Sequence, residues 1–108
     1  MESQKPSIFL YAYEPSPGVI KEITAGIEEE GVLFEIMHRP SMPAIDLAEA
    51  AATDSRLSIG IGVHRHMAEV IQIASGRAIS IDMADSGQGY RKAGANAARV
   101  VKRKPIRN

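Results

Sequence analysis

The segment that most constrains this chain is residues 56–66, where apolar side chains alternate with small or polar ones. Successive side chains of a β-strand point to opposite faces of the sheet, so the alternation predicts a strand with two unlike faces. The two faces would carry Leu57, Ile59, Ile61 and Val63 on one side, and Ser58, Gly60, Gly62 and His64 on the other. The apolar face fits a buried core, and the glycine face allows a helix to approach the sheet closely.

The remainder of the chain alternates between strand-like and helix-like segments. Strands are expected at residues 7–13, 32–37, 68–74 and 78–83, and helices from the N-cap Ser16 to Gly31, over 44–52, and from Asp85 to near Lys104. Ser75, Gly76 and Arg77 form a turn of hairpin length, so one strand should run antiparallel. The order βαβαβββα predicts a three-layer α/β/α fold, in which a mixed five-stranded sheet has helices on both faces.

The composition fits a single domain over residues 1–108 with one modest core. Of the 108 residues, 44% are hydrophobic, and a chain of this size buries roughly two thirds of its unfolded surface. There is no cysteine, which excludes disulfides, cysteine zinc sites and thiol catalysis. There is also no apolar run of the roughly 18 residues that span a membrane, and no signal-peptide core. A soluble, intracellular protein is expected.

Charge is balanced overall but unevenly distributed. All 13 acidic residues precede Arg91, whereas residues 91–108 hold 7 of the 13 Lys and Arg residues. In the expected last helix, small residues share one face, and the opposite arc carries Arg91, Lys92, Arg99, Lys102 and Arg103. Two interpretations stay open: an electrostatic surface for a protein or nucleic acid, or a solvated helix with favourable cations near its C-terminus.

Three adjacent glutamates, Glu28 to Glu30 of the motif GIEEEG, close the first expected helix. The helix dipole is negative at this end, so each carboxylate costs about 0.3 to 1 kcal/mol there instead of stabilising. At about 100° per residue, Glu29 lies opposite Ile20 and should point straight outward, whereas Glu30 falls near the edge of the apolar stripe. The motif is either a solvated acidic face or a carboxylate presented to a cation or a partner.

Two histidines, His64 and His66, stand at the end of the strand over 56–66 and could project to one side as a metal chelate. No third ligand and no HExxH pattern lies nearby, so a role in capping the sheet edge or in hydrogen bonding competes with metal binding. Gly87 and Gly89 could expose backbone amides to an anion or serve only the turn. No catalytic triad or acid–base pair is visible, and no residue is assigned a catalytic role.

Three motifs taken together resemble the small subunits of reactivating factors for B12-dependent diol and glycerol dehydratases. They are Gly26-Ile-Glu-Glu-Glu-Gly31, Ile59-Gly-Ile-Gly-Val-His-Arg-His66 and Ala95-Asn-Ala-Ala-Arg-Val-Val-Lys102. Their order and spacing match the family across most of the chain, and Lys104-Pro-Ile-Arg107 is similar to the family's closing Pro-Phe-Arg. Residues 74–88 depart most from the family, so no role is carried onto them.

The resemblance implies the fold of B12-dependent dehydratase-associated subunits, which is like that of anticodon-binding domains, and a chaperone-like role without catalysis. It implies a large partner subunit with an actin-like ATPase domain, which binds Mg²⁺ and ATP or ADP in a two-plus-two heterotetramer. The small subunit would exchange with the medium subunit of an inactivated dehydratase, so that damaged adenosylcobalamin, the client's cofactor, can leave. The system would serve propanediol or glycerol utilization in the cytoplasm, either free or inside a bacterial microcompartment.

By position, the resemblance implies that Glu29 is a ligand to the large subunit's Mg²⁺. Glu28, Glu30, His64 and His66 are expected at the partner interface, and the chain is expected to bind no cofactor of its own. Two alternatives stay open. One is a component of the dehydratase itself, similar to its medium subunit, and the other is a small nucleic-acid-binding α/β module that uses the basic last helix.

Overall fold

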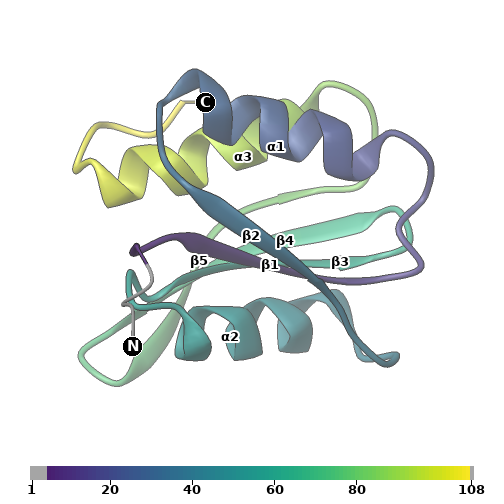
Figure 1. The fold of residues 1–108 in the computed structure, drawn as a ribbon, viewed down its shortest axis with the longest axis horizontal. Helices are drawn as coiled ribbons and strands as arrows, with labels where there is room; N and C mark the ends of the chain where they lie inside the picture. Colours follow the sequence, from purple (N-terminus) through teal and green to yellow (C-terminus); the bar gives the residue numbers. More distant parts are fainter. Residues whose placement is uncertain (1–4, 108) are drawn as a thin grey trace.

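The computed structural model describes residues 5–107, which form a sheet between two helical layers (Figure 1). The strands are β1 (Ile8–Tyr13), β2 (Phe34–His38), β3 (Ile59–His64), β4 (Met67–Ala74) and β5 (Arg77–Ala84). The helices are α1 (Val19–Glu29), α2 (Ala44–Asp54) and α3 (Gly89–Val101). Helices α1 and α3 lie on one side of the sheet, and α2 covers the other. The predicted three-layer α/β/α arrangement is confirmed.

The sheet has the strand order β2-β1-β3-β4-β5. β1 pairs in parallel with both β2 and β3, whereas β4 pairs antiparallel with β3 and with β5. β4 is therefore the one strand that runs against the other four, as the hairpin at Ser75 and Gly76 predicted. A second tight turn joins β3 to β4, as the direct pairing of His64 with Met67 shows. The sequence did not indicate this turn.

The glycine face of β3 receives α2, as its alternation predicted. A Cβ added at Gly60 or Gly62 would collide with the backbone of α2 at Ala48. Ala44, Ala48, Ala51 and Ala52 of α2 are buried. The absence of side chains on β3 thus lets the helix backbone approach the sheet.

The opposite face of the sheet holds the larger apolar core. It is made of residues from β1, β3, β4, α1 and α3, among them Ile8, Leu10, Ile23, Ile27, Ile61, Val63, Val70, Tyr90 and Ala97. α1 and α3 also cross each other closely. A Cβ at Gly94 would collide with the carbonyl oxygen of Ile23, and a Cβ at Gly26 with that of Arg91. These two glycines therefore set the distance between the helices.

Four predicted starting points were wrong by two to four residues: β2 begins at Phe34 instead of Val32, α3 at Gly89 instead of Asp85, and the other two concern α1 and β3. α1 begins at Val19 after Gly18, which has a φ of +86°, and Ser16 does not cap it through its side chain. The strand expected from Arg56 begins only at Ile59. The residues before it form a turn instead, in which the amide of Ser58 donates to the carbonyl of Ser55.

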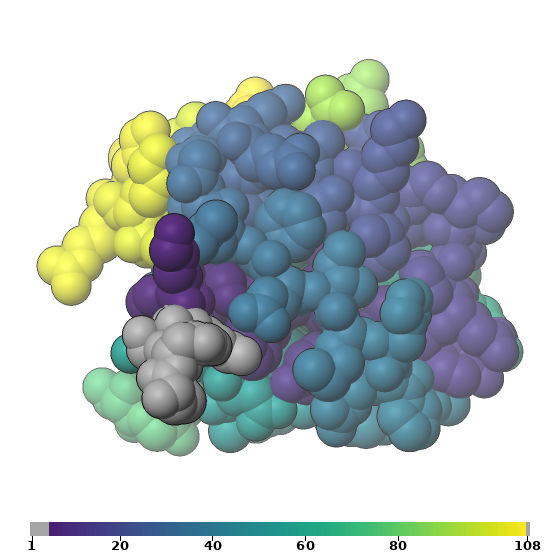
Figure 2. All heavy atoms as spheres, viewed as in Figure 1, coloured from purple at the N-terminus to yellow at the C-terminus, as the bar shows by residue number. Residues whose placement is uncertain are grey.

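The last helix is shorter than predicted, and the chain after it folds back. α3 ends at Val101, and Arg103 takes a left-handed conformation with a φ of +59°. The following residues run beside the end of α1, where the C-terminal segment (yellow) meets the blue segment in Figure 2. This reversal brings the basic C-terminal segment onto the acidic motif of α1.

Candidate partner interface

The three glutamates of the GIEEEG motif lie in three different environments. Glu28 and Glu29 are exposed, whereas the side chain of Glu30 is only 9% exposed. Gly31 follows with a φ of +74°, a conformation that glycine adopts without strain and that ends the helix. The predicted end of the helix at Gly31 is confirmed, and the three carboxylates are not equivalent.

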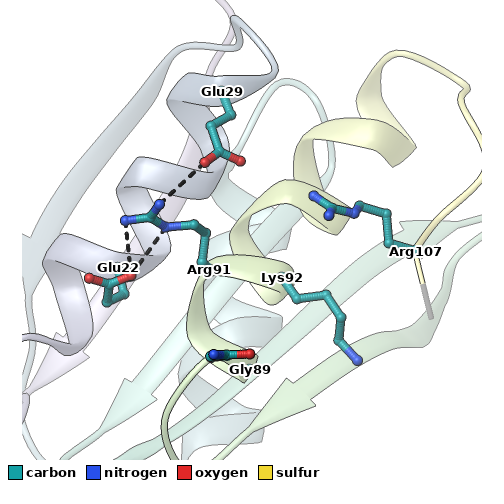
Figure 3. A pocket seen from close by; sticks show the side chains of 7 residues that line it. Glu22, Glu29, Gly89, Arg91, Lys92 and Arg107 are labelled. Carbon is teal, nitrogen blue, oxygen red and sulfur yellow. Dashed lines mark hydrogen bonds and ion pairs between the residues drawn. The ribbon is translucent and has the colours of Figure 1, made fainter.

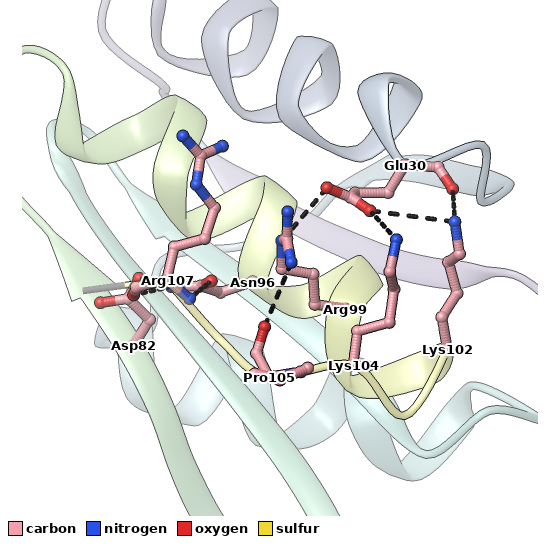
Figure 4. Close-up of polar contacts among 8 residues, drawn as sticks. All are labelled: Glu30, Asp82, Asn96, Arg99, Lys102, Lys104, Pro105 and Arg107. Carbon is pink, nitrogen blue, oxygen red and sulfur yellow. Dashed lines mark hydrogen bonds and ion pairs between the residues drawn. The ribbon is translucent and has the colours of Figure 1, made fainter.

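Glu30 is enclosed by cations from the last helix and the segment after it (Figure 4). Its carboxylate lies 3.2 Å from Nε of Arg99, 3.6 Å from Nζ of Lys104 and 3.8 Å from Nζ of Lys102. The Lys102 ammonium also donates to the carbonyl oxygen of Glu30 at 2.7 Å. These cations offset the unfavourable helix dipole at this end of α1. Glu30 therefore joins α1 to the C-terminal segment within the chain.

The C-terminal segment is held in place by the side chain of Asn96, which is only 1% exposed. Its Oδ1 accepts from the amide of Arg107 at 2.7 Å, and its Nδ2 donates to the carbonyl of Arg107 at 3.1 Å (Figure 4). Nδ2 also donates to Asp82 of β5 at 3.0 Å. A single buried amide thus fixes the backbone of Arg107 against α3.

Glu29 is exposed as predicted, but it does not point straight outward. Nη1 of Arg91, from the first turn of α3, lies 3.5 Å from its carboxylate (Figure 3). The same guanidinium contacts Oε1 of Glu22 through both Nε and Nη2, each at 3.1 Å. The helical wheel missed this contact because it placed Glu29 relative to the sheet alone, and α3 lies beside α1.

An open groove of about 710 Å³ lies between α1 and the start of α3. It is lined by Glu22, Glu29, Gln88, Gly89, Arg91, Lys92 and Arg107. Figure 3 shows that the lining comes from three parts of the chain, α1, α3 and the C-terminal segment, and that Glu22, Glu29 and Arg91 meet within it. Sequence reasoning singled out Glu29, Arg91 and Lys92, but it missed Glu22 and Arg107. Glu22 had a usable signal, because it precedes Glu29 by seven residues and so shares its helix face.

The two histidines do not form the side-by-side pair that the predicted strand implied. His64 ends β3 and stacks on Tyr13, with ring centroids 5.1 Å apart. His66 lies in the turn to β4, and its carbonyl accepts from the hydroxyl of Tyr90 at 2.6 Å. Among residues 5–107, no three His, Asp or Glu side chains gather closely enough to hold a metal ion. The histidines lie at the carboxyl end of β3 and beside Tyr90 at the start of α3, rather than beside the glutamates at the end of α1.

The basic arc of α3 is not the outward cationic surface that the sequence suggested. Arg91, Arg99 and Lys102 all face α1, where they pair with its glutamates. The helices cross at Gly26 and Gly94, so side chains that flank this crossing meet across it. The arc is therefore largely neutralised within the chain, which removes the main argument for a nucleic-acid-binding module.

A separate polar contact lies on the α2 side of the sheet, away from the groove. The hydroxyl of Tyr11 donates to Asp54 at 2.5 Å, and the guanidinium of Arg39 lies over the Tyr11 ring. Burial, followed by the hydrogen bond and the charge of Asp54, raises the pKa of Tyr11 to about 12. Since the phenol stays neutral and fully bonded, this contact ties α2 to β1 and carries no chemistry.

The chain is similar to known proteins over nearly its whole length. The model of the dehydratase medium subunit family matches residues 5–107. The diol dehydratase-reactivating factor small subunit of Klebsiella michiganensis is 36% identical over 95% of this chain and 85% of its own length. The propanediol dehydratase-reactivating factor small subunit of Salmonella typhimurium is 34% identical over 95% of this chain and 91% of its own length. The chain therefore belongs to the dehydratase medium subunit family.

Solved structures agree with this assignment and narrow it. A chain of diol dehydratase-reactivating factor, in complex with ADP and Mg²⁺, superimposes with a TM-score of 0.82 at 34% identity, covering 97% of this chain and all of that one. A chain of glycerol dehydratase reactivase has a TM-score of 0.81 at 24% identity and shows the same fold. The curated relatives named above are small subunits of reactivating factors, the group that the sequence motifs resemble.

The expectation that no segment spans a membrane can be compared with the helices. None of those in the described part of the chain combines the length and the apolar character needed to cross a lipid bilayer.

Proposed function

We propose that this chain is the non-catalytic small subunit of a factor that reactivates B12-dependent diol or glycerol dehydratase. The observation that carries the proposal is its similarity, over nearly the whole length, to reactivating-factor small subunits in both sequence and fold. In this role the chain makes and breaks no covalent bonds. It acts by binding a large ATPase subunit, in a two-plus-two assembly, and the dehydratase in turn.

The membership of the dehydratase medium subunit family supports an exchange mechanism. A chain with the fold of the medium subunit is able to take its place against the other subunits of an inactivated dehydratase. That exchange would open the coenzyme pocket and release the damaged cobalamin. Nucleotide bound to the large subunit would set the affinity for the small one, and the ADP and Mg²⁺ in the related reactivating factor support this part of the proposal.

Glu29 is the residue proposed to reach the partner's Mg²⁺. Its carboxylate is a hard oxygen donor, it is exposed, and only one weak contact holds it. Mg²⁺ is usually bound through one or two carboxylates together with phosphate and water, so one glutamate from this chain fits a site completed by the partner. Glu29 would hold that metal, which would supply the positive charge that attracts this carboxylate to the partner.

The other interface residues take different parts in the proposal. Glu28 is exposed beside Glu29 and contributes flanking charge. Glu30 is committed to cations of its own chain, so its part is to hold the end of α1 in place. His64 ends β3 and His66 follows in the turn beside the start of α3, so they would touch a partner there rather than beside the end of α1.

The test replaces Glu29 with Gln and measures binding of the full chain to its large subunit in the presence of ADP and Mg²⁺. The Glu29→Gln variant should bind at least about 10-fold more weakly, because a lost metal ligand costs no less than a lost outer-shell partner. The matched control is Glu28→Gln, which removes the same charge from an exposed neighbour and should bind nearly normally.

Unchanged affinity of the Glu29→Gln variant would contradict the proposed metal contact. An equal loss in the Glu28→Gln variant would also contradict it, because general acidity of the motif would then explain the binding. Isothermal titration at several Mg²⁺ concentrations separates these outcomes.

A component of the dehydratase itself, similar to its medium subunit, is the second candidate, and the matching family favours it. Co-purification from the native cell separates the two functions. Recovery with a large ATPase subunit supports the reactivating factor. Recovery with catalytic dehydratase subunits, and without an ATPase, supports the second candidate.

A further inference from the structure

The guanidinium of Arg91 is shared unequally between two carboxylates of α1. Glu22 receives two of its nitrogens, each at 3.1 Å, whereas Glu29 receives one at 3.5 Å. The side chains of Arg91, Glu22 and Glu29 are all between 41% and 48% exposed. Exposure therefore does not distinguish the two glutamates, and the geometry of the guanidinium does.

The backbone of Arg91 cannot follow Glu29 if that side chain moves. Its carbonyl oxygen packs directly on Gly26, where a Cβ would collide with it. Glu22 and Glu29 lie on either side of that contact along α1. When Glu29 leaves, the backbone of Arg91 therefore stays in place, and its guanidinium still has the two contacts with Glu22.

A metal ion and Arg91 compete for the same carboxylate. Both are cations, so a metal drawn to Glu29 meets the repulsion of the nearby guanidinium as well. Glu22 reduces both the competition of Arg91 for Glu29 and its repulsion of the metal, because Glu22 contacts two nitrogens of the guanidinium and neutralises its charge. Glu22 thus keeps Glu29 loosely held and available.

We infer that Arg91 and Glu22 together set how readily Glu29 is transferred from its own chain to a cation of the partner. Arg91 opposes the transfer, and Glu22 promotes it by occupying Arg91. The two are positioning residues, since neither supplies a ligand itself. This inference rests on the proposed function, because it needs the large subunit and its Mg²⁺.

The experiment measures the Mg²⁺ concentration for half-maximal binding of the full chain to its large subunit in ADP. Arg91→Gln should lower this midpoint by about 1.5- to 5-fold, the factor that matches the coupling of an exposed ion pair. Glu22→Gln should raise it by a similar factor, because Arg91 then has Glu29 as its only carboxylate partner in the groove. The double variant should behave like Arg91→Gln, since Glu22 acts only through Arg91.

The matched control, Arg65→Gln, lies in the turn between β3 and β4, outside the lining of the groove, and breaks another exposed Arg–Glu pair, with Glu14 at 3.2 Å. It should leave the Mg²⁺ midpoint unchanged. Thermal unfolding of each variant is measured alongside, because a merely structural role would change the melting temperature and leave the Mg²⁺ midpoint alone.

Three outcomes overturn the inference. A higher Mg²⁺ midpoint in Arg91→Gln would mean that Arg91 assists the transfer, and equal midpoints in all variants would mean that it has no part. In both cases a normal loss of Mg²⁺ dependence in Glu29→Gln leaves the proposed function standing. If Glu29→Gln keeps the full Mg²⁺ response, the proposed metal contact fails together with the inference. Failure of the chain to bind the large subunit would instead contradict the proposed function itself.

Discussion

The two ends of the α1–α3 pair treat glutamates of the same motif in opposite ways. At the closed end, formed by Glu30, Arg99, Lys102 and Lys104, three cations surround one carboxylate that is 9% exposed. At the open end, the groove between α1 and the start of α3, Glu22 and Glu29 share one guanidinium. Two adjacent residues of one motif therefore differ: Glu30 is enclosed by cations of its own chain, and Glu29 is exposed in the groove.

The difference arises from the C-terminal segment rather than from α1. Residues after Val101 turn back and bring Lys102 and Lys104 onto Glu30. Asn96 fixes the end of this segment at Arg107. Charge alone thus does not decide which carboxylate is exposed. Enclosure by a neighbouring segment decides it.

The largest expected effect on the free energy of unfolding comes from a substitution that separates α1 from α3 and so disrupts both the closed end and the open end. In Gly94→Ala, the new methyl group collides with the carbonyl of Ile23, so α3 must move away from α1. We expect a loss of about 3 kcal/mol in the free energy of unfolding, because the obstacle is backbone and cannot rotate away. Gly89→Ala, whose Cβ would meet only the side chain of Ala84 at 3.2 Å, is the control in the same helix. Urea denaturation that finds equal costs for both variants would refute this account of the helix crossing.

A smaller effect is expected from opening the closed end alone. Asn96→Ala removes three hydrogen bonds and leaves Asp82 and the amide of Arg107 without this partner. The free energy of unfolding should fall by about 2 kcal/mol. Hydrogen exchange should show the Arg107 amide losing its protection, whereas the control Gln88→Ala, at the exposed open end, should leave it protected. Retained protection in Asn96→Ala would show that the segment is held by its ion pairs instead.

The smallest expected effect on the free energy of unfolding comes from neutralising one of the two neighbouring carboxylates, Glu29 or Glu30. Glu30→Gln should lower the free energy of unfolding by about 1 kcal/mol, because three cations lose a mostly enclosed partner. Glu29→Gln should change it by less than about 0.5 kcal/mol, as expected for an exposed pair. Both values are measured by urea denaturation at low and high salt. Equal costs for the two variants would remove the distinction between the ends.

Much of the fold was predictable because it depends on short-range patterns. The alternation of residues 57–64 predicted both the buried face of β3 and the close approach of α2 to Gly60 and Gly62. The hairpin turn at Ser75 and Gly76 predicted that one strand runs antiparallel. These features need only the period of two of a strand and the small size of glycine. Element starts were less predictable, as at Val19, because turn geometry decides them.

The candidate site was only partly predictable. Helix periodicity predicted that Glu29 of the motif GIEEEG is exposed and that Glu30 lies near the edge of the apolar stripe. The partners did not, because Arg91 lies 62 residues after Glu29, and Lys102 lies 72 residues after Glu30. No local pattern links residues so far apart.

The sequence by itself determined the α/β class, the glycine face of the central strand and the family to which the acidic motif points. These rest on periodicity and on motif order, which a linear chain displays directly. Only the tertiary structure decided which of the three glutamates is enclosed. That choice depends on how closely α1 and α3 cross and on where the C-terminal segment returns, and both are set by packing between segments distant in the chain.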